Sequence, residues 1–255
     1  MKLVVKSTLV LGSLLAAAAT LAQTTAAAAP AAPEPEYTLS YNVGAISDYR
    51  FRGIAQSSFN PAVQAGIDYA HKSGFYVGAW GSNVSWIKDF AGAADGTLEV
   101  DLYGGYKGEI SKDLTYDVGV ITYQYPSNNA ATNANTVEVY GALSYGIVTA
   151  KYSRSTGNFV ANADSSGSAY FELAANFDLG NGFTLTPHVG HQTIPNQTAN
   201  GDYTDYSLTL AKDFGNGVSA TVSAIKTTAD DAFYKVGSFD NLGKSALAVG
   251  VKYSF

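Results

Sequence analysis

Hydrophobic and polar residues alternate through the last nine positions of the chain. Leu247, Val249, Val251, Tyr253 and Phe255 occupy every second position, and small or polar residues occupy the positions between them. Because successive side chains of a strand point to opposite faces, this pattern predicts a strand with one apolar face. Taken alone, the segment favours a strand that faces lipid, and the final strand of a soluble sandwich is the alternative.

The same alternation recurs along the rest of the chain. Together with the last segment, it predicts twelve strands, over residues 37–45, 63–69, 75–84, 98–107, 114–120, 137–145, 148–153, 170–177, 183–189, 206–210, 218–224 and 247–255. The faces of 75–84 are ambiguous, because Phe75 and Val77 lie on one side while Tyr76 and Trp80 lie on the other. Most segments are about ten residues long, which is the length that a tilted strand needs to cross a bilayer.

The links between the predicted strands sort into two classes. Links after even-numbered strands are short, at 71–74, 108–113, 146, 180–182 and 215–217, whereas those after odd-numbered strands are long, at 47–60, 85–96, 126–135, 155–167, 194–202 and 228–244. Two of the short links carry Asn-Gly, the preferred pair of a tight hairpin. Short turns on one rim and long loops on the other are typical of outer-membrane barrels.

We therefore predict an all-β fold, a transmembrane antiparallel up-and-down barrel of about 12 strands, in which the first strand pairs with the twelfth. An even strand count places both termini on the periplasmic side. With neighbouring strands about 4.8 Å apart and tilted near 40°, the backbone diameter is roughly 24 Å. Inward side chains would narrow this lumen to a pore for ions or small solutes.

The N-terminal residues predict export. Lys2 and Lys6 precede an apolar run over 9–21, followed by small residues, which is the layout of a signal peptide. The run is shorter than the roughly 20 apolar residues of a transmembrane helix. We expect a signal peptide over 1–22, with cleavage after Ala28 as the alternative, an Ala- and Pro-rich periplasmic leader over 23–36, and a barrel over 37–255 in the outer membrane of a Gram-negative bacterium.

Composition adds two constraints. The net charge is -6, and removal of Lys2 and Lys6 makes it -8, so nucleic acid is a poor partner. The 18 Tyr and 26 Gly residues suit half-buried strands joined by turns, and Tyr favours membrane interfaces. The aromatic residues beside the short turns predict a periplasmic girdle of Phe75, Tyr106, Tyr145, Phe183, Phe214, Tyr253 and Phe255.

Three segments carry a family resemblance: 48–54 (DYRFRGI), 74–84 (GFYVGAWGSNV) and 98–106 (LEVDLYGGY). In these segments the chain resembles the TorF-family porins, the Gcw_chp group of bacterial proteins. The likeness covers essentially the whole mature chain and implies an outer-membrane barrel with porin activity, without a substrate or catalytic residues. The last strand also resembles the C-terminal strand of Gram-negative barrels, which implies that Tyr253 and Phe255 form an assembly signal.

Several side chains are candidates for chemistry. Glu99 and Asp101 share one face and suit either acid-base work or a wet, charged pore wall. His188 and His191 point to opposite faces and make a poor metal pair. Arg50 lies two residues before Arg52 at the start of the first long loop, where the two suit either a constriction or rim cations paired with loop acids. We expect no catalytic residue, no metal and no cofactor.

We therefore predict a porin for passive diffusion, with a weak cation preference because inward acids outnumber inward bases. The predicted pore-lining residues are Arg50, Arg52, Asp68, Glu99, Asp101, Asp117, Glu138, Lys151, Glu172 and His188. The expected partners are outer-membrane lipid, the barrel-assembly machinery, and small solutes or ions. A non-conducting structural or adhesin barrel is the main alternative, and a lipid-modifying enzyme of the outer membrane is a weaker one.

Overall fold

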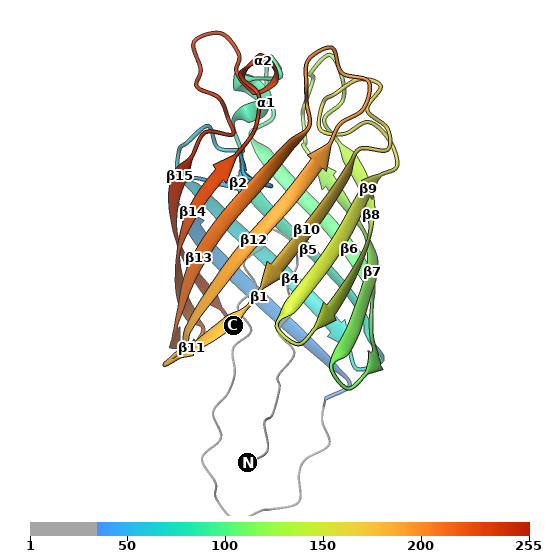
Figure 1. Ribbon diagram of the computed structural model, residues 1–255, viewed down its shortest axis with the longest axis vertical. Helices are drawn as coiled ribbons and strands as arrows, with labels where there is room; N and C mark the ends of the chain where they lie inside the picture. The colour runs from blue at the N-terminus through green and yellow to red at the C-terminus, as the bar shows by residue number, and fades with distance from the viewer. Residues whose placement is uncertain (1–34) are drawn as a thin grey trace, which may run out of the picture.

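The computed structural model describes residues 35–255 and forms a closed antiparallel β-barrel of 12 strands (Figure 1). The predicted fold is confirmed, and two stacked open sheets are excluded because the wall closes on itself. The predicted signal peptide, and the predicted leader up to residue 34, lie outside the described residues.

Each of the twelve predicted segments is a strand of the wall. The wall strands are β1 (Tyr37–Ile46), β4 (Ala62–His71), β5 (Phe75–Asn83), β6 (Leu98–Ser111), β7 (Leu114–Gln124), β8 (Thr136–Tyr145), β9 (Val148–Ser155), β10 (Ala169–Ala175) with β11 (Phe177–Gly180), β12 (Phe183–Thr193), β13 (Tyr203–Gly215), β14 (Val218–Thr227) and β15 (Ala246–Ser254). The eighth predicted strand is interrupted at Asn176, which divides it into β10 and β11. Both parts pair with β12.

The first and last strands close the barrel. β1 pairs with β15 over a register that runs from Asn42 opposite Ser254 to Ile46 opposite Gly250. Beyond it, Tyr41 N donates to Phe255 O at 2.9 Å and Phe255 N donates to Tyr41 O at 3.0 Å. The predicted pairing of the first strand with the twelfth is therefore confirmed.

The two rims differ as the sequence predicts. The Asn-Gly turns have positive φ at both residues, 52° and 76° at Asn181 and Gly182, and 51° and 80° at Asn216 and Gly217, as a tight hairpin requires. The opposite rim carries the long loops, with two short helices, α1 (Trp86–Asp89) and α2 (Asp231–Tyr234), both at this end of the barrel in Figure 1. No helix within residues 35–255 is long and apolar enough to span a membrane.

The outer face of the wall is apolar. Leu247 is 66% exposed and Val251 is 58% exposed, although both are strongly hydrophobic. The ambiguous strand β5 follows the same rule, because Phe75 and Val77 are exposed whereas Trp80 is only 7% exposed and faces inward. An apolar surface that surrounds the whole wall fits lipid as its solvent.

The inner face combines tyrosine with glycine. A Cβ atom added at Gly190 would lie 1.9 Å from the hydroxyl of Tyr170, and one added at Gly119 would lie 2.5 Å from the hydroxyl of Tyr140. Glycine therefore leaves the space that a tyrosine ring on a nearby strand occupies. This packing accounts for part of the high content of both residue types.

Candidate functional site

The first long loop folds into the barrel. Residues 47–60, which we call the inward segment, contain a small hairpin of β2 (Arg50–Phe51) and β3 (Ile54–Ala55). Its turn has positive φ at both residues, 49° at Arg52 and 80° at Gly53, so the Gly at the second position suits the tight turn. Most of the segment is buried, including Ala55 at 0% exposure. The sequence predicted a long loop here but not this hairpin.

The inward segment contacts widely separated strands of the wall. The ring of Tyr49 meets that of Trp80 on β5 with centroids 5.4 Å apart, and the ring of Phe51 meets that of Tyr123 on β7 at 5.1 Å. On the other side, a Cβ atom added at Gly53 would lie 2.6 Å from a methyl group of Thr227 on β14. The segment therefore crosses the lumen and narrows it near the long-loop rim.

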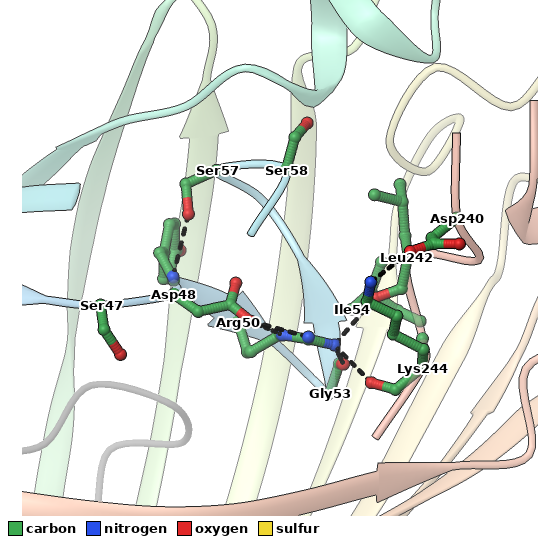
Figure 2. Close-up of polar contacts among 12 residues, drawn as sticks. Ser47, Asp48, Arg50, Gly53, Ile54, Ser57, Ser58, Asp240, Leu242 and Lys244 are labelled. Atoms are coloured by element: carbon green, nitrogen blue, oxygen red, sulfur yellow. Dashed lines mark hydrogen bonds and ion pairs between the residues drawn. The ribbon is translucent and has the colours of Figure 1, made fainter. Parts of the chain in front are cut away.

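Arg50 fastens the inward segment to the loop that follows β14. Figure 2 shows its guanidinium between Asp48 and the carbonyls of Gly53, Leu242 and Lys244. Its Nε donates to Asp48 Oδ2 at 2.7 Å, and its Nη1 lies 2.9 Å from Leu242 O and 3.0 Å from Lys244 O. Arg50 thus holds the inward segment against the loop that follows β14.

Arg52 fastens the inward segment to the barrel wall. Its Nη1 and Nη2 donate to the two carboxylate oxygens of Glu138 on β8 at 3.0 and 2.6 Å, and Nη1 also donates to Gln192 Oε1 at 2.7 Å. The guanidinium lies 4.3 Å from the ring centroid of Tyr170. Burial disfavours its charge, but attraction from Glu138 outweighs this effect and raises the pKa of Arg52. The bidentate pair is held in a fixed geometry.

Glu99 and Asp101 lie beneath the inward segment. Their exposed fractions are 1% and 3%, and the hydroxyl of Tyr49 donates to Glu99 Oε1 at 3.2 Å. Glu99 Oε2 and Asp101 Oδ1 have no hydrogen-bond partner within residues 35–255. The two carboxylates share the inward face as the sequence predicts, but they are covered by the segment and do not form an open, wet wall.

The lumen toward the short-turn rim is less covered. Asp68 accepts a hydrogen bond from Tyr103, and Asp117 accepts one from Tyr76 at 2.6 Å. Lys107 Nζ lies 3.5 Å from Asp117 Oδ2 in a half-buried ion pair. This half of the lumen therefore presents charged side chains that remain partly accessible to water.

Besides the Glu99–Asp101 pair and the side chains near Asp68 and Asp117, a third group of polar side chains lies in the lumen, on β9, β10, β12 and β13. His188 Nε2 lies 3.1 Å from Glu172 Oε2, His188 Nδ1 lies 3.4 Å from Asp205 Oδ1, and Lys151 Nζ lies 3.9 Å from Glu172 Oε1. His191 is exposed on the opposite face. The part of the chain that the structure describes contains no group of three or more His, Cys, Asp or Glu side chains suited to a metal ion.

Sequence reasoning missed four inward residues that contact these groups: Tyr49, Tyr123, Gln192 and Asp205. The last three lie where the strands extend toward the long loops, beyond the ends of the predicted segments. Extending the alternation past the predicted ends would have found them. Gln192 lies four residues after the inward His188 and so shares its face, whereas Asp205 directly precedes the outward Tyr206 and so points inward. Tyr49 has no such signal, since its loop lacks a periodic pattern.

Comparison with known proteins gives one family and a set of similar folds. Residues 28–255 match Gcw_chp, described as a bacterial protein of unknown function. Comparison with curated proteins finds no match. The NanC porin is similar in structure, with a TM-score of 0.55, 11% identity, and coverage of 86% of this chain and 99% of that chain. A KdgM porin in complex with disordered oligogalacturonate gives a TM-score of 0.53, 9% identity, and coverage of 85% and 98%.

Proposed function

The chain belongs to the Gcw_chp family, and we propose that it is an outer-membrane porin through which ions and small solutes diffuse passively. The observation that carries this proposal is a closed wall that is apolar outside and lined with charged and tyrosine side chains inside. A barrel whose interior is polar, and not filled by a hydrophobic core, accommodates water and polar solutes. The fold shared with the KdgM and NanC porins and the resemblance to TorF-family porins support the same proposal.

We propose that the barrel spans the outer membrane of a Gram-negative bacterium, with the short turns in the periplasm and the long loops outside. Its partners are then outer-membrane lipid, the barrel-assembly machinery during insertion, and the permeating solutes. The short turns on one rim and the long loops on the other support this orientation, and the exposed aromatic residues near the short turns, such as Phe75, Phe214 and Phe255, fit a girdle at that membrane interface.

The inward segment sets the size of the path. Tyr49, Phe51 and Arg52 occupy the lumen between opposite walls, so solutes pass a constriction near the long-loop rim. We therefore propose a small unitary conductance. A barrel that does not conduct is the competing function, and the filling of the lumen by this segment favours it. Catalysis at Glu99 and Asp101 has less support, since both carboxylates are buried.

The permeant solutes are proposed to be cations rather than acidic sugars. The KdgM porin was solved in complex with an oligogalacturonate, a sugar chain that carries carboxylates. In this chain Asp68, Asp117 and Glu172 face the lumen, and such acidic side chains repel an anion. Similarity in fold at 9% identity leaves room for this difference in lining.

Planar-bilayer recording tests the proposal. We expect small conductance steps from the purified barrel, and larger steps when residues 49–56 are replaced by a Gly-Ser segment of equal length. Replacement of residues 195–200, in another long loop, is the control and leaves the steps unchanged. Absence of steps in both the native barrel and the 49–56 variant, with folding confirmed by heat modifiability on gels, would reject porin activity and favour a structural or adhesin barrel.

A further inference from the structure

A cavity of about 230 Å³ lies at the long-loop end of the barrel. We call it the mouth cavity. The inward segment contributes Phe51 and Ile54 to its lining, and the surrounding loops contribute Trp86, Phe159, Phe233 and other residues. Figure 1 places the loops that carry α1 and α2 together at this end. Five stretches far apart in sequence thus line one partly open space.

The lining of the mouth cavity is aromatic and uncharged. It includes three further rings, those of Phe90, Tyr203 and Tyr234, and Gln56 and Asn162 supply its two amide side chains. Among residues 35–255, no Lys, Arg, Asp, Glu or His side chain lines it. Because a buried charge without a partner is strongly disfavoured, the cavity suits a neutral molecule with a ring.

Two polar atoms in the lining residues lack hydrogen-bond partners. Gln56 Nε2 donates to Ile54 O at 3.1 Å, which identifies Gln56 Oε1 as the free acceptor, and Trp86 Nε1 is a free donor. Gln56 is 4% exposed and Trp86 is 6% exposed, and neither atom has a partner among residues 35–255. Unsatisfied buried polar atoms are uncommon and cost free energy, so a ligand that satisfies either one is favoured.

The backbone on one side of the mouth cavity also has an unusual conformation. Val160 and Ala161 line the cavity with φ of 48° and 60°. Positive φ is disfavoured for a β-branched residue such as Val. Such a conformation persists where the surroundings enforce it, and it is found at ligand sites.

We propose that the mouth cavity binds a small neutral aromatic alcohol. An apolar cavity of about 150 Å³ accommodates benzene, so the larger space here fits one ring with a short chain. A hydroxyl group both donates and accepts, and therefore complements either Gln56 Oε1 or Trp86 Nε1 once that side chain turns toward the cavity. This site is independent of whether the barrel conducts, since a closed barrel retains the same cavity.

Isothermal titration of the detergent-solubilised barrel with 3-phenylpropan-1-ol tests the proposal. We expect saturable binding at one site. Ala91→Phe and Val236→Trp fill the cavity from two different loops and are expected to weaken binding at least tenfold. Ala94→Phe is the matched control, because Ala94 lies in the same loop as Ala91 but is exposed and does not line the cavity. The alcohol also partitions into the detergent, but to the same extent for all variants, so this effect cancels when the dissociation constants of the variants are compared.

Two comparisons test the chemistry of the site. The carboxylate 3-phenylpropanoate is expected to bind at least tenfold more weakly than the alcohol, because the lining has no cation. Trp86→Phe keeps the ring and removes the donor, and is expected to weaken binding of the alcohol about threefold or more. Equal binding by the native chain and both filling variants, each shown to be folded by heat modifiability, would overturn the site, as would a preference for the carboxylate.

Discussion

Neutral tyrosine hydroxyls hold most of the lumen carboxylates. The pairs are Tyr49 with Glu99, Tyr76 with Asp117, Tyr103 with Asp68, Tyr123 with Glu138, and Tyr170 with Asp205. A hydroxyl donor satisfies a carboxylate without adding a positive charge. The barrel therefore keeps an excess of acids inside while leaving few of them without a hydrogen bond.

Glu138 also meets Arg52 as a buried ion pair, with side-chain exposures of 6% for Arg52 and 0% for Glu138. Removal of one partner from such a pair strands the other charge and costs about 3–5 kcal/mol. We expect Arg52→Ala to lower the unfolding temperature and to loosen the inward segment, so that trypsin added from the long-loop side cleaves after Arg50. Arg154→Ala, which removes an exposed cation, is the control.

A second substitution distinguishes two causes of the lost stability of Arg52→Ala, the unpaired charge of Glu138 and the lost packing of the Arg52 side chain. Adding Glu138→Gln to Arg52→Ala neutralises the carboxylate that the first change leaves unpaired. Part of the lost thermal stability should then return, although trypsin still reaches Arg50. Full resistance of the single variant to trypsin, with unchanged unfolding, would show that the ion pair does not hold the segment.

At the scale of elements, the period of two determined every strand of the wall, because one face meets an apolar solvent and the other a polar lumen. The hairpin of β2 and β3 was not predicted, since its residues are buried on both sides and its contacts come from strands distant in sequence. Trp86 in α1 and Phe159 in the loop after β9 also lie outside any periodic pattern, and only the folded barrel brings them together at the mouth cavity.

The seam between β1 and β15 is shorter than its neighbour. Five residue pairs join β1 to β15, whereas ten join β1 to β4. The ring of Phe255 stacks on those of Tyr41 and Tyr253, with centroids 5.6 and 5.4 Å apart, and its backbone extends the seam. Closure of the barrel therefore depends on residues near the end of β15.

We expect Phe255→Ala to reduce the amount of folded, heat-modifiable protein in the outer membrane, because it removes both ring contacts at the seam. Phe214→Ala is the matched control, since Phe214 is 61% exposed near a short turn and Phe255 is 64% exposed. Quantitative blots of heated and unheated outer-membrane fractions measure the effect. Equal folded levels in the two variants would remove any special role of Phe255 in assembly.

At the scale of the whole molecule, the inward segment divides the lumen charges into two groups. Glu99 and Asp101 lie beneath it, with exposed fractions of 1% and 3%. Asp68 and Asp117 are half-buried on the short-turn side of the lumen. In the proposed pore, a permeating ion would pass the second group through water, whereas the protein covers the first group. The sequence placed both groups on one inward face and gave no means to separate them.

Because the two groups differ in access to water, single substitutions in each group test which acids set the proposed preference for cations. Rings of acids favour cations, but screening over about 8 Å at physiological salt keeps the preference weak in a wet lumen. We expect the native barrel to pass potassium modestly better than chloride in reversal-potential measurements under a salt gradient. Asp68→Asn should reduce this preference more than Glu99→Gln does, because Asp68 remains partly accessible to water and Glu99 does not.

Asp68→Asn removes the charge but keeps the local structure, since the amide oxygen of Asn still accepts the hydrogen bond that Tyr103 donates to Asp68. Asp178→Asn makes the same substitution at an exposed position beside a short turn, and should leave the reversal potential nearly unchanged. Chloride passing better than potassium in the native barrel would contradict the proposed cation preference. A larger effect of Glu99→Gln than of Asp68→Asn would instead mean that the inward segment leaves the lumen during conduction, because only its departure exposes Glu99 to the permeating ions.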